Sequence, residues 1–259
     1  MITVEGLSHR FADVEVLDGL DLDIPEGCFA GLVGPSGCGK STLLRVLAGL
    51  LVPSTGDAAI DGRSVIGRPG TAGYMPQRDV LLPWRRALGN ATVGAEVAGV
   101  GRRQAEELAR PLFDRFGLAG FERAWPAELS GGMRQRLALL RTFLCGRDVL
   151  LLDEPFGALD AITRRDMHLW LQHVWQSDRR TVLLVTHDVE EALTLSDIVI
   201  VLSDRPARIV DQLPVDLPRP RTLDAVISDT FLAAKAKLLR ALEQGRVAGE
   251  SNPALRDLG

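Results

Sequence analysis

Short apolar runs alternate with amphipathic helical patterns along this chain. Runs rich in β-branched and other apolar residues predict strands at positions 30–33, 73–77, 149–153, 181–186 and 198–202. The alternation of such strands with helices is typical of an α/β protein with a mostly parallel sheet. Two earlier segments, 2–11 and 16–24, alternate apolar and polar residues, which predicts an antiparallel hairpin or a small side sheet.

Several longer segments carry the apolar spacing of helices. They cover residues 41–50, 104–116, 131–144, 160–175 and 223–242. Pro111 lies inside the second of them, and a proline within a helix is expected to kink or split it. From about residue 84 to residue 147 the strand patterns stop, which predicts a helical subdomain inserted into an α/β domain of residues 1–245. Residues 246–259 have little apolar periodicity, and we expect a flexible C-terminal tail there.

The composition limits the possible functions. The chain has 259 residues with 30 basic and 34 acidic side chains, a formal net charge of −4, and 46% hydrophobic residues. This balance argues against a disordered chain and against a protein held on nucleic acid by phosphate contacts. No apolar run approaches the roughly 18 residues of a membrane span, and nothing resembles a secretory leader. The few scattered cysteines do not suggest a disulfide framework, so we expect a soluble cytosolic chain.

A glycine-rich loop follows the first predicted parallel strand. Its residues match the pattern G-x-x-x-x-G-K-[ST], between a strand and a helix, and they are Gly34, Pro35, Ser36, Gly37, Cys38, Gly39, Lys40, Ser41 and Thr42. Glycines let successive backbone N–H groups face phosphate oxygens at a helix N-terminus. Lys40 would reach the β- and γ-phosphates, and the Ser41 hydroxyl would ligate Mg²⁺. A glycine-rich turn that precedes a lysine by chance is the alternative, but this chain uses lysine at three positions only.

Two carboxylates end the predicted strand at 149–153. Asp153 is placed to hold Mg²⁺ beside the phosphate loop, and Glu154 to take a proton from an attacking water. Solvated acidic residues at a strand end, or a cap for the next helix, are the alternative. Together with the phosphate loop, these residues predict a nucleotide triphosphatase.

A histidine closes the next predicted strand in the equivalent place. His187 could contact a γ-phosphate and orient the water, or it could be a helix-start residue beside Asp188. The other histidines have no such context, and we expect His9, His168 and His173 at the surface.

A second possible anion site opens a later helix. Ser130, Gly131 and Gly132 offer backbone N–H groups at a helix N-terminus, in the sequence Leu129-Ser-Gly-Gly-Met133. One chain with one phosphate loop rarely needs a second such site. Two chains that pair head to tail would use it, each offering it to the nucleotide of the other. A plain Ser-Gly-Gly helix cap is the alternative.

These motifs, in this order, resemble those of the ATP-binding-cassette (ABC) transporter ATPases over residues 1–245. The resemblance implies a P-loop fold, ATP and Mg²⁺ as ligands, and a homodimer that encloses two ATP molecules. Phe11 would stack on adenine, unless it is only an apolar residue of the side sheet. Gln77 would touch Mg²⁺ and the attacking water, and Asp160 would contact the opposite subunit. Met133 departs from the family pattern, which has Gln there, and this leaves one hydrogen bond in doubt.

Residues 78–85 resemble the branch of bacterial importers for nitrate, sulfonates and taurine, which includes carriers of pyrimidine precursors. The resemblance implies an ATP-hydrolysing subunit on the cytoplasmic face of the membrane, with transmembrane permease subunits and an extracytoplasmic substrate-binding protein. Leu81, Leu82, Pro83 and Trp84 would form the docking surface for a permease helix; alternatively, Trp84 packs the helical insert. A soluble ABC ATPase of another class and a non-hydrolysing nucleotide sensor are the competing interpretations.

Overall fold

The computed structural model describes the backbone of residues 1–250 and the side chains of residues 1–246. Its larger sheet has the strand order β10-β9-β3-β8-β7-β6. All these strands run parallel except the edge strand β10. Their bounds are β3 Phe29–Val33, β6 Gly73–Met75, β7 Val149–Asp153, β8 Thr181–Val185, β9 Ile198–Leu202 and β10 Ile209–Pro214. Every residue of β3, β7 and β8 is buried, as expected for parallel strands covered on both faces.

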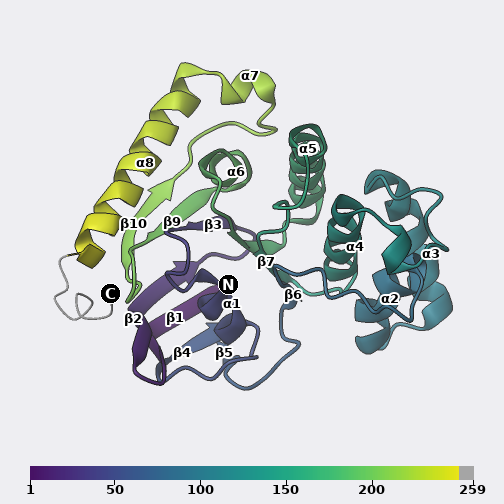
Figure 1. The fold of residues 1–259 in the computed structure, drawn as a ribbon, viewed down its shortest axis with the longest axis horizontal. Helices are drawn as coiled ribbons and strands as arrows, with labels where there is room; N and C mark the ends of the chain where they lie inside the picture. Colours follow the sequence, from purple (N-terminus) through teal and green to yellow (C-terminus); the bar gives the residue numbers. More distant parts are fainter. Residues whose placement is uncertain (251–259) are drawn as a thin grey trace.

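A smaller antiparallel sheet is formed mainly by the start of the chain, as the alternating pattern predicts. Its order is β2-β1-β4-β5, with bounds β1 Ile2–Phe11, β2 Val14–Ile24, β4 Thr55–Ile60 and β5 Arg63–Ser64. Helix α1, Lys40–Leu47, shares one apolar cluster with both sheets. This packing places the smaller sheet beside α1 (Figure 1).

Between β6 and β7 the described chain contains helices and no strand. They are α2 Ala87–Val97, α3 Arg102–Arg115, the 3₁₀ helix Pro126–Glu128 and α4 Gly131–Phe143, and they lie together at one side of the sheet (Figure 1). Pro111 lies inside the single continuous helix α3, so the predicted split is wrong. Burial of Ala109 before the proline and Phe113 after it anchors both halves of α3 to one apolar cluster.

The C-terminal part adds helices to the sheet. Their bounds are α5 Ala161–Asp178, α6 Val189–Leu195, α7 Leu223–Val226 and α8 Asp229–Glu250. The predicted single helix at 223–242 is two helices, because the chain turns at Ile227 and Ser228, and the Ser228 hydroxyl accepts a hydrogen bond from Phe231 N. Helix α8 also continues to Glu250, past the predicted start of the tail at residue 246. The rest of the predicted tail, 251–259, lies outside the described residues.

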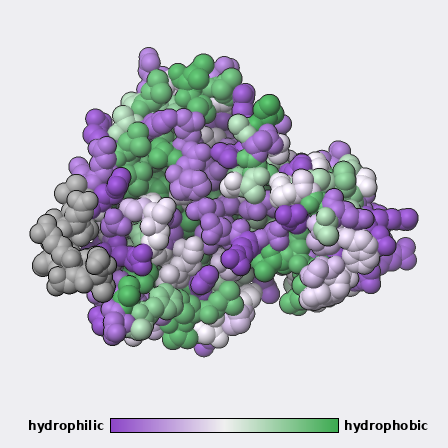
Figure 2. Space-filling view, viewed as in Figure 1, coloured by the Kyte–Doolittle hydropathy of each residue, from purple (hydrophilic) through white to green (hydrophobic). Residues whose placement is uncertain are grey.

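The surface of the molecule is mixed in character. Figure 2 shows hydrophobic residues of one face in several separate groups among hydrophilic ones. Among the described helices, none combines the length and apolar character that crossing a bilayer requires.

The packing of α8 on the sheet gives a stability prediction. Phe231 is fully buried in the cluster that α8 forms with β9 and β10, whereas its neighbour Leu232 is half-exposed. We expect Phe231→Ala to lower the free energy of unfolding by about 3–5 kcal/mol, because it leaves a cavity. Leu232→Ala, the matched control, should change it by less than about 0.5 kcal/mol. Urea unfolding of both variants measures this, and equal losses would contradict the assigned packing of α8.

Candidate active site

The phosphate loop curls around the side chain of Lys40. The loop follows β3, and α1 begins at Lys40 itself. The buried Lys40 Nζ donates to the carbonyl oxygens of Gly34, at 2.8 Å, and Pro35, at 2.7 Å. Gly39 has φ of 126°, and a Cβ there would lie 2.7 Å from Leu17 Cδ2 and 3.2 Å from the Val16 carbonyl oxygen. Only glycine fits this backbone, so the close approach of β2 fixes the shape of the loop.

Ser41 and Asp153 meet directly behind the loop. The Ser41 Oγ donates to Asp153 Oδ1 at 3.1 Å. Burial raises the pKa of the Asp153 carboxyl; the Ser41 hydrogen bond lowers this pKa, and the charge of Glu154 raises it further. In the described residues no three His, Cys, Asp or Glu side chains converge as a metal cluster. One carboxylate and one hydroxyl nevertheless fit Mg²⁺, which keeps several waters and binds substrate phosphates.

Glu154 has a strained backbone at the end of β7. Its φ is 49°, a left-handed conformation that costs a non-glycine residue about 1–3 kcal/mol. Three hydrogen bonds hold it: Glu154 N donates to the Val185 carbonyl at 2.9 Å, and the Glu154 carbonyl accepts from Gln135 Nε2 at 3.2 Å and from Gly157 N at 3.3 Å. Gln135 is not among the site residues that the sequence motifs predict. A polar residue on the buried face of the amphipathic helix was the available signal.

Gln77 and His187 converge on one oxygen of Glu154. Gln77 Nε2 donates to Glu154 Oε2 at 3.1 Å, and His187 Nδ1 lies 3.3 Å from the same atom. The three side chains come from the ends of three strands, β6, β7 and β8. His187 therefore contacts the predicted base, while the next residue, Asp188, caps α6 through Glu190 N and Glu191 N.

Phe11 lies at the end of β1 and is 45% exposed. Phe11 belongs to the side sheet, as the interpretation as an apolar sheet residue requires. Its ring is nevertheless open to solvent, as stacking on adenine requires. The His9 ring packs edge-on against it with centroids 4.4 Å apart. His9 is buried, so its predicted surface position is wrong, and its two ring nitrogens have no hydrogen-bond partner among the described residues.

The Ser130 segment opens α4 and does not join the site of its own chain. Ser130 Oγ accepts from Met133 N at 3.2 Å, which is the plain cap that the alternative predicted. Ser130 and Gly131 are exposed, and no hydrogen bond or ion pair of the described part connects residues 130–132 to the phosphate loop. Figure 1 shows α4 beside α2 and α3, and α1 on the side of the antiparallel sheet. Met133, at the position where the family pattern has Gln, packs partly buried on an apolar cluster.

Comparison with known proteins agrees with this geometry. The sequence pattern of the family described as ABC transporter matches residues 17–157, which is more than half of the chain. The chain belongs to the ABC transporter ATPases. A solved bacterial ABC transporter cassette, described as dimeric, superposes on this ABC ATPase with a TM-score of 0.75 at 26% identity, over 83% of this chain and 99% of the other. The predicted α/β P-loop fold and the predicted ATPase activity are thereby confirmed.

Two relatives of this ABC ATPase carry names from the importer branch. An aliphatic sulfonates import ATP-binding protein of Rhodococcus jostii is 48% identical over 245 residues, 92% of each chain. One of Streptomyces avermitilis is 47% identical over 221 residues, 85% of this chain and 83% of its own. The resemblance to the importer branch is confirmed by these relatives.

The raised pKa of Asp153 gives a prediction about pH. A carboxyl whose pKa is higher in the folded than in the unfolded state lowers the stability of the fold as the pH rises from the unfolded-state pKa to the folded-state pKa. We therefore expect Asp153→Asn, which keeps an oxygen acceptor for Ser41, to raise the Tm of the nucleotide-free protein at pH 7.5. The gain should shrink as the pH falls toward about 4. Thermal unfolding across pH measures this; the exposed Asp148→Asn is the control, and a gain independent of pH would be the contrary result.

Proposed function

We propose that this ABC ATPase powers a membrane importer as a nucleotide-sandwich homodimer. The observation that carries the proposal is the convergence of Gln77 and His187 on Glu154, beside the Ser41–Asp153 pair and the phosphate loop. This arrangement suits hydrolysis rather than mere nucleotide sensing. The names of the relatives support an importer with an aliphatic sulfonate as cargo. The resemblance of residues 78–85 to the importer branch extends the proposed cargo to related small solutes such as taurine or nitrate.

In the proposed mechanism the phosphate loop binds the triphosphate of ATP, and Phe11 stacks on adenine. Lys40 leaves its carbonyl partners and binds the β- and γ-phosphates. Ser41, Asp153 and Gln77 would hold Mg²⁺. This cation would neutralise charge that develops on the phosphates.

Glu154 is the proposed base for the attacking water. Gln77 and His187 both contact its Oε2, so Oε1 is the oxygen left to accept the proton. Because His187 uses Nδ1 for this contact, its Nε2 is free to face the γ-phosphate. The base is thus oriented by both neighbours before nucleotide binds.

A second copy of this chain would complete each nucleotide site. Ser130 and Gly131 lie exposed at the start of α4, away from their own phosphate loop, and a helix N-terminus attracts phosphate. The γ-phosphate held by one copy would meet residues 130–132 of the other. Asp160, at the turn before α5, would touch the opposite subunit. The dimeric state described for the solved cassette supports this pairing.

Permease subunits would dock beside residues 80–84, on the cytoplasmic face of the membrane. Trp84 is 71% exposed, which disfavours the alternative that it packs the helical insert. Val80, Val93 and Val97 line a neighbouring hollow of about 360 Å³ between β6, α2 and α4. An apolar helix of a membrane subunit fits such a surface. The remaining partner would be an extracytoplasmic substrate-binding protein.

Replacing the base tests hydrolysis and dimerisation together. We expect Glu154→Gln to bind ATP but to lose at least about a hundredfold in kcat, because the amide cannot accept the proton. ATP would then accumulate in a stable dimer, visible by size-exclusion chromatography with light scattering. Glu26→Gln, at an exposed site, should behave as wild type. Wild-type turnover by Glu154→Gln would remove Glu154 from its proposed role.

Replacing the exposed tryptophan tests the docking surface. We expect Trp84→Ala to keep the Tm, since the side chain is exposed, but to weaken co-purification with the membrane subunits encoded by neighbouring genes at least about tenfold. Trp84→Phe should retain most of the binding. Leu239→Ala, on the exposed face of α8, is the control for loss of a surface apolar group. Undiminished binding by Trp84→Ala would place the docking surface elsewhere.

A further inference from the structure

Arg164 connects two turns that border the active site. It lies in the first turn of α5, where Nη2 donates to the Leu159 carbonyl at 2.9 Å and Nη1 lies 3.7 Å from Asp188 Oδ2. Leu159 belongs to the turn of residues 158–160, which we name the Asp160 turn. Asp188 belongs to the turn of residues 186–188, which we name the His187 turn. One guanidinium thus contacts both turns.

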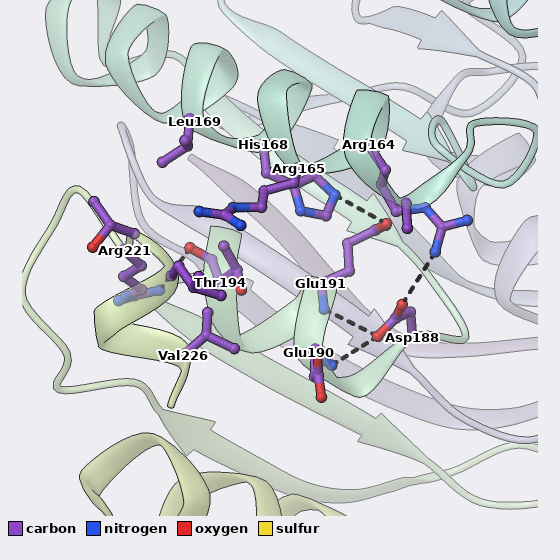
Figure 3. Close-up of a pocket in the computed structure, with 13 residues that line it drawn as sticks. Arg164, Arg165, His168, Leu169, Asp188, Glu190, Glu191, Thr194, Arg221 and Val226 are labelled. Carbon is purple, nitrogen blue, oxygen red and sulfur yellow. Dashed lines mark hydrogen bonds and ion pairs between the residues drawn. The ribbon is translucent and has the colours of Figure 1, made fainter. Parts of the chain in front are cut away.

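His168 makes a second connection one helical turn farther along α5. Its Nε2 lies 3.3 Å from Glu191 Oε2 of α6, and the two side chains are only 11% and 5% exposed. The predicted surface position of His168 is therefore wrong. Its ring also packs edge-on against Phe156, two residues after Glu154, with centroids 4.8 Å apart. Figure 3 shows Arg164 and His168 extending from α5 toward Asp188 and Glu191 at the start of α6, beside a cavity of about 220 Å³.

The two helices joined in this way start at the two turns. Asp160 caps α5 by accepting from Ile162 N at 3.1 Å and Thr163 N at 3.0 Å. Asp188 caps α6 and directly follows His187, which lies 3.3 Å from Glu154. A displacement of the Asp160 turn would therefore move the start of α5, and through Arg164 the His187 turn.

We propose that Arg164 is a positioning residue for His187, with the His168–Glu191 pair as a second link. These contacts make the Asp160 turn and the His187 turn move as one unit. The inference rests on the proposed homodimer, in which the opposite subunit touches Asp160. The arrival of that subunit would then fix His187, which already lies 3.3 Å from Glu154, in the position that hydrolysis needs, so that hydrolysis waits for the closed dimer.

A purely structural role for Arg164 gives a different expectation. The side chains of Arg164 and Asp188 are each about one-third exposed, and an ion pair of that kind adds little stability. If the contact only supported the fold, its loss would leave kcat nearly unchanged, or would lower kcat together with the Tm. Positioning instead predicts a loss of kcat with an unchanged Tm and an unchanged KM for ATP.

The test is a double-mutant cycle on the steady-state ATPase of the full chain. We expect Arg164→Ala and Asp188→Asn each to lower kcat about tenfold, with KM for ATP within about twofold, and the double variant to be no slower than either. Asparagine still caps a helix, so Asp188→Asn keeps the start of α6. The matched control is Arg165→Ala, at the exposed neighbouring arginine, and it should retain wild-type kcat. Additive losses, or a loss that also raises KM, would overturn the proposal.

The second link and the dimer are tested separately. His168→Gln can still donate to Glu191 and should retain kcat, whereas His168→Leu should lower it; equal rates in both variants would overturn the second link.

In the Glu154→Gln background, Arg164→Ala should still form the ATP-bound dimer, because it changes neither the phosphate loop nor residues 130–132. Failure of Glu154→Gln itself to dimerise would contradict the proposed function. If Glu154→Gln does dimerise but the losses of Arg164→Ala and Asp188→Asn are additive, only the positioning role of Arg164 is overturned.

Discussion

The side-by-side position of four parallel strands is the constraint on which the active site depends. β3, β8, β7 and β6 are neighbours in the sheet, and their carboxyl ends lie along one edge. The phosphate loop leaves β3, His187 follows β8, Glu154 follows β7 and Gln77 follows β6. The register pairs both Leu32 of β3 and Asp153 of β7 with Val185 of β8, so the loops that follow these three strands begin at the same height along the sheet. Backbone pairing thus brings side chains from four distant parts of the sequence to one edge of the sheet.

This convergence has local energetic costs, which the surrounding elements offset. Burial works against the ionised form of Asp153, and Glu154 adopts a left-handed backbone beside it. The hydrogen bond from Ser41 stabilises the Asp153 carboxylate, and the hydrogen bond from Gln135 holds the backbone carbonyl of Glu154. Gln135 belongs to α4, the helix that also presents Ser130. The helix that exposes the proposed second anion site therefore also supports the backbone of the proposed base, so a movement of α4 would displace Glu154.

The sequence predicts the parts of this site that follow from local pattern. The strands at 149–153 and 198–202 match the structure to the residue, because strands buried on both faces are continuous apolar runs bounded by polar residues. β4 and the edge strand β10 escaped prediction, since their half-exposed residues lack such a run. His168 has no motif context that predicts its burial: its partner Glu191 is distant in sequence, and burial of a paired polar residue leaves no periodic signal. The roles of the site residues stay predictions, although Gln77, Glu154 and His187 do lie together.

The separation of the Ser130 segment from the phosphate loop gives the α5–α6 contacts their proposed importance. A lone chain already has the base, its two orienting neighbours and the Ser41–Asp153 pair in contact. If that constellation were sufficient, ATP would be hydrolysed without any link to a partner. Dependence on a second copy requires a path from the surface that meets it to the residues around the base. The Asp160 turn is at one end of such a path and His187 at the other, and Arg164 spans them with one side chain. A connection this short needs no rearrangement of the sheet. The strand register that assembles the site can therefore stay fixed while contact with the second copy adjusts His187 beside the proposed base.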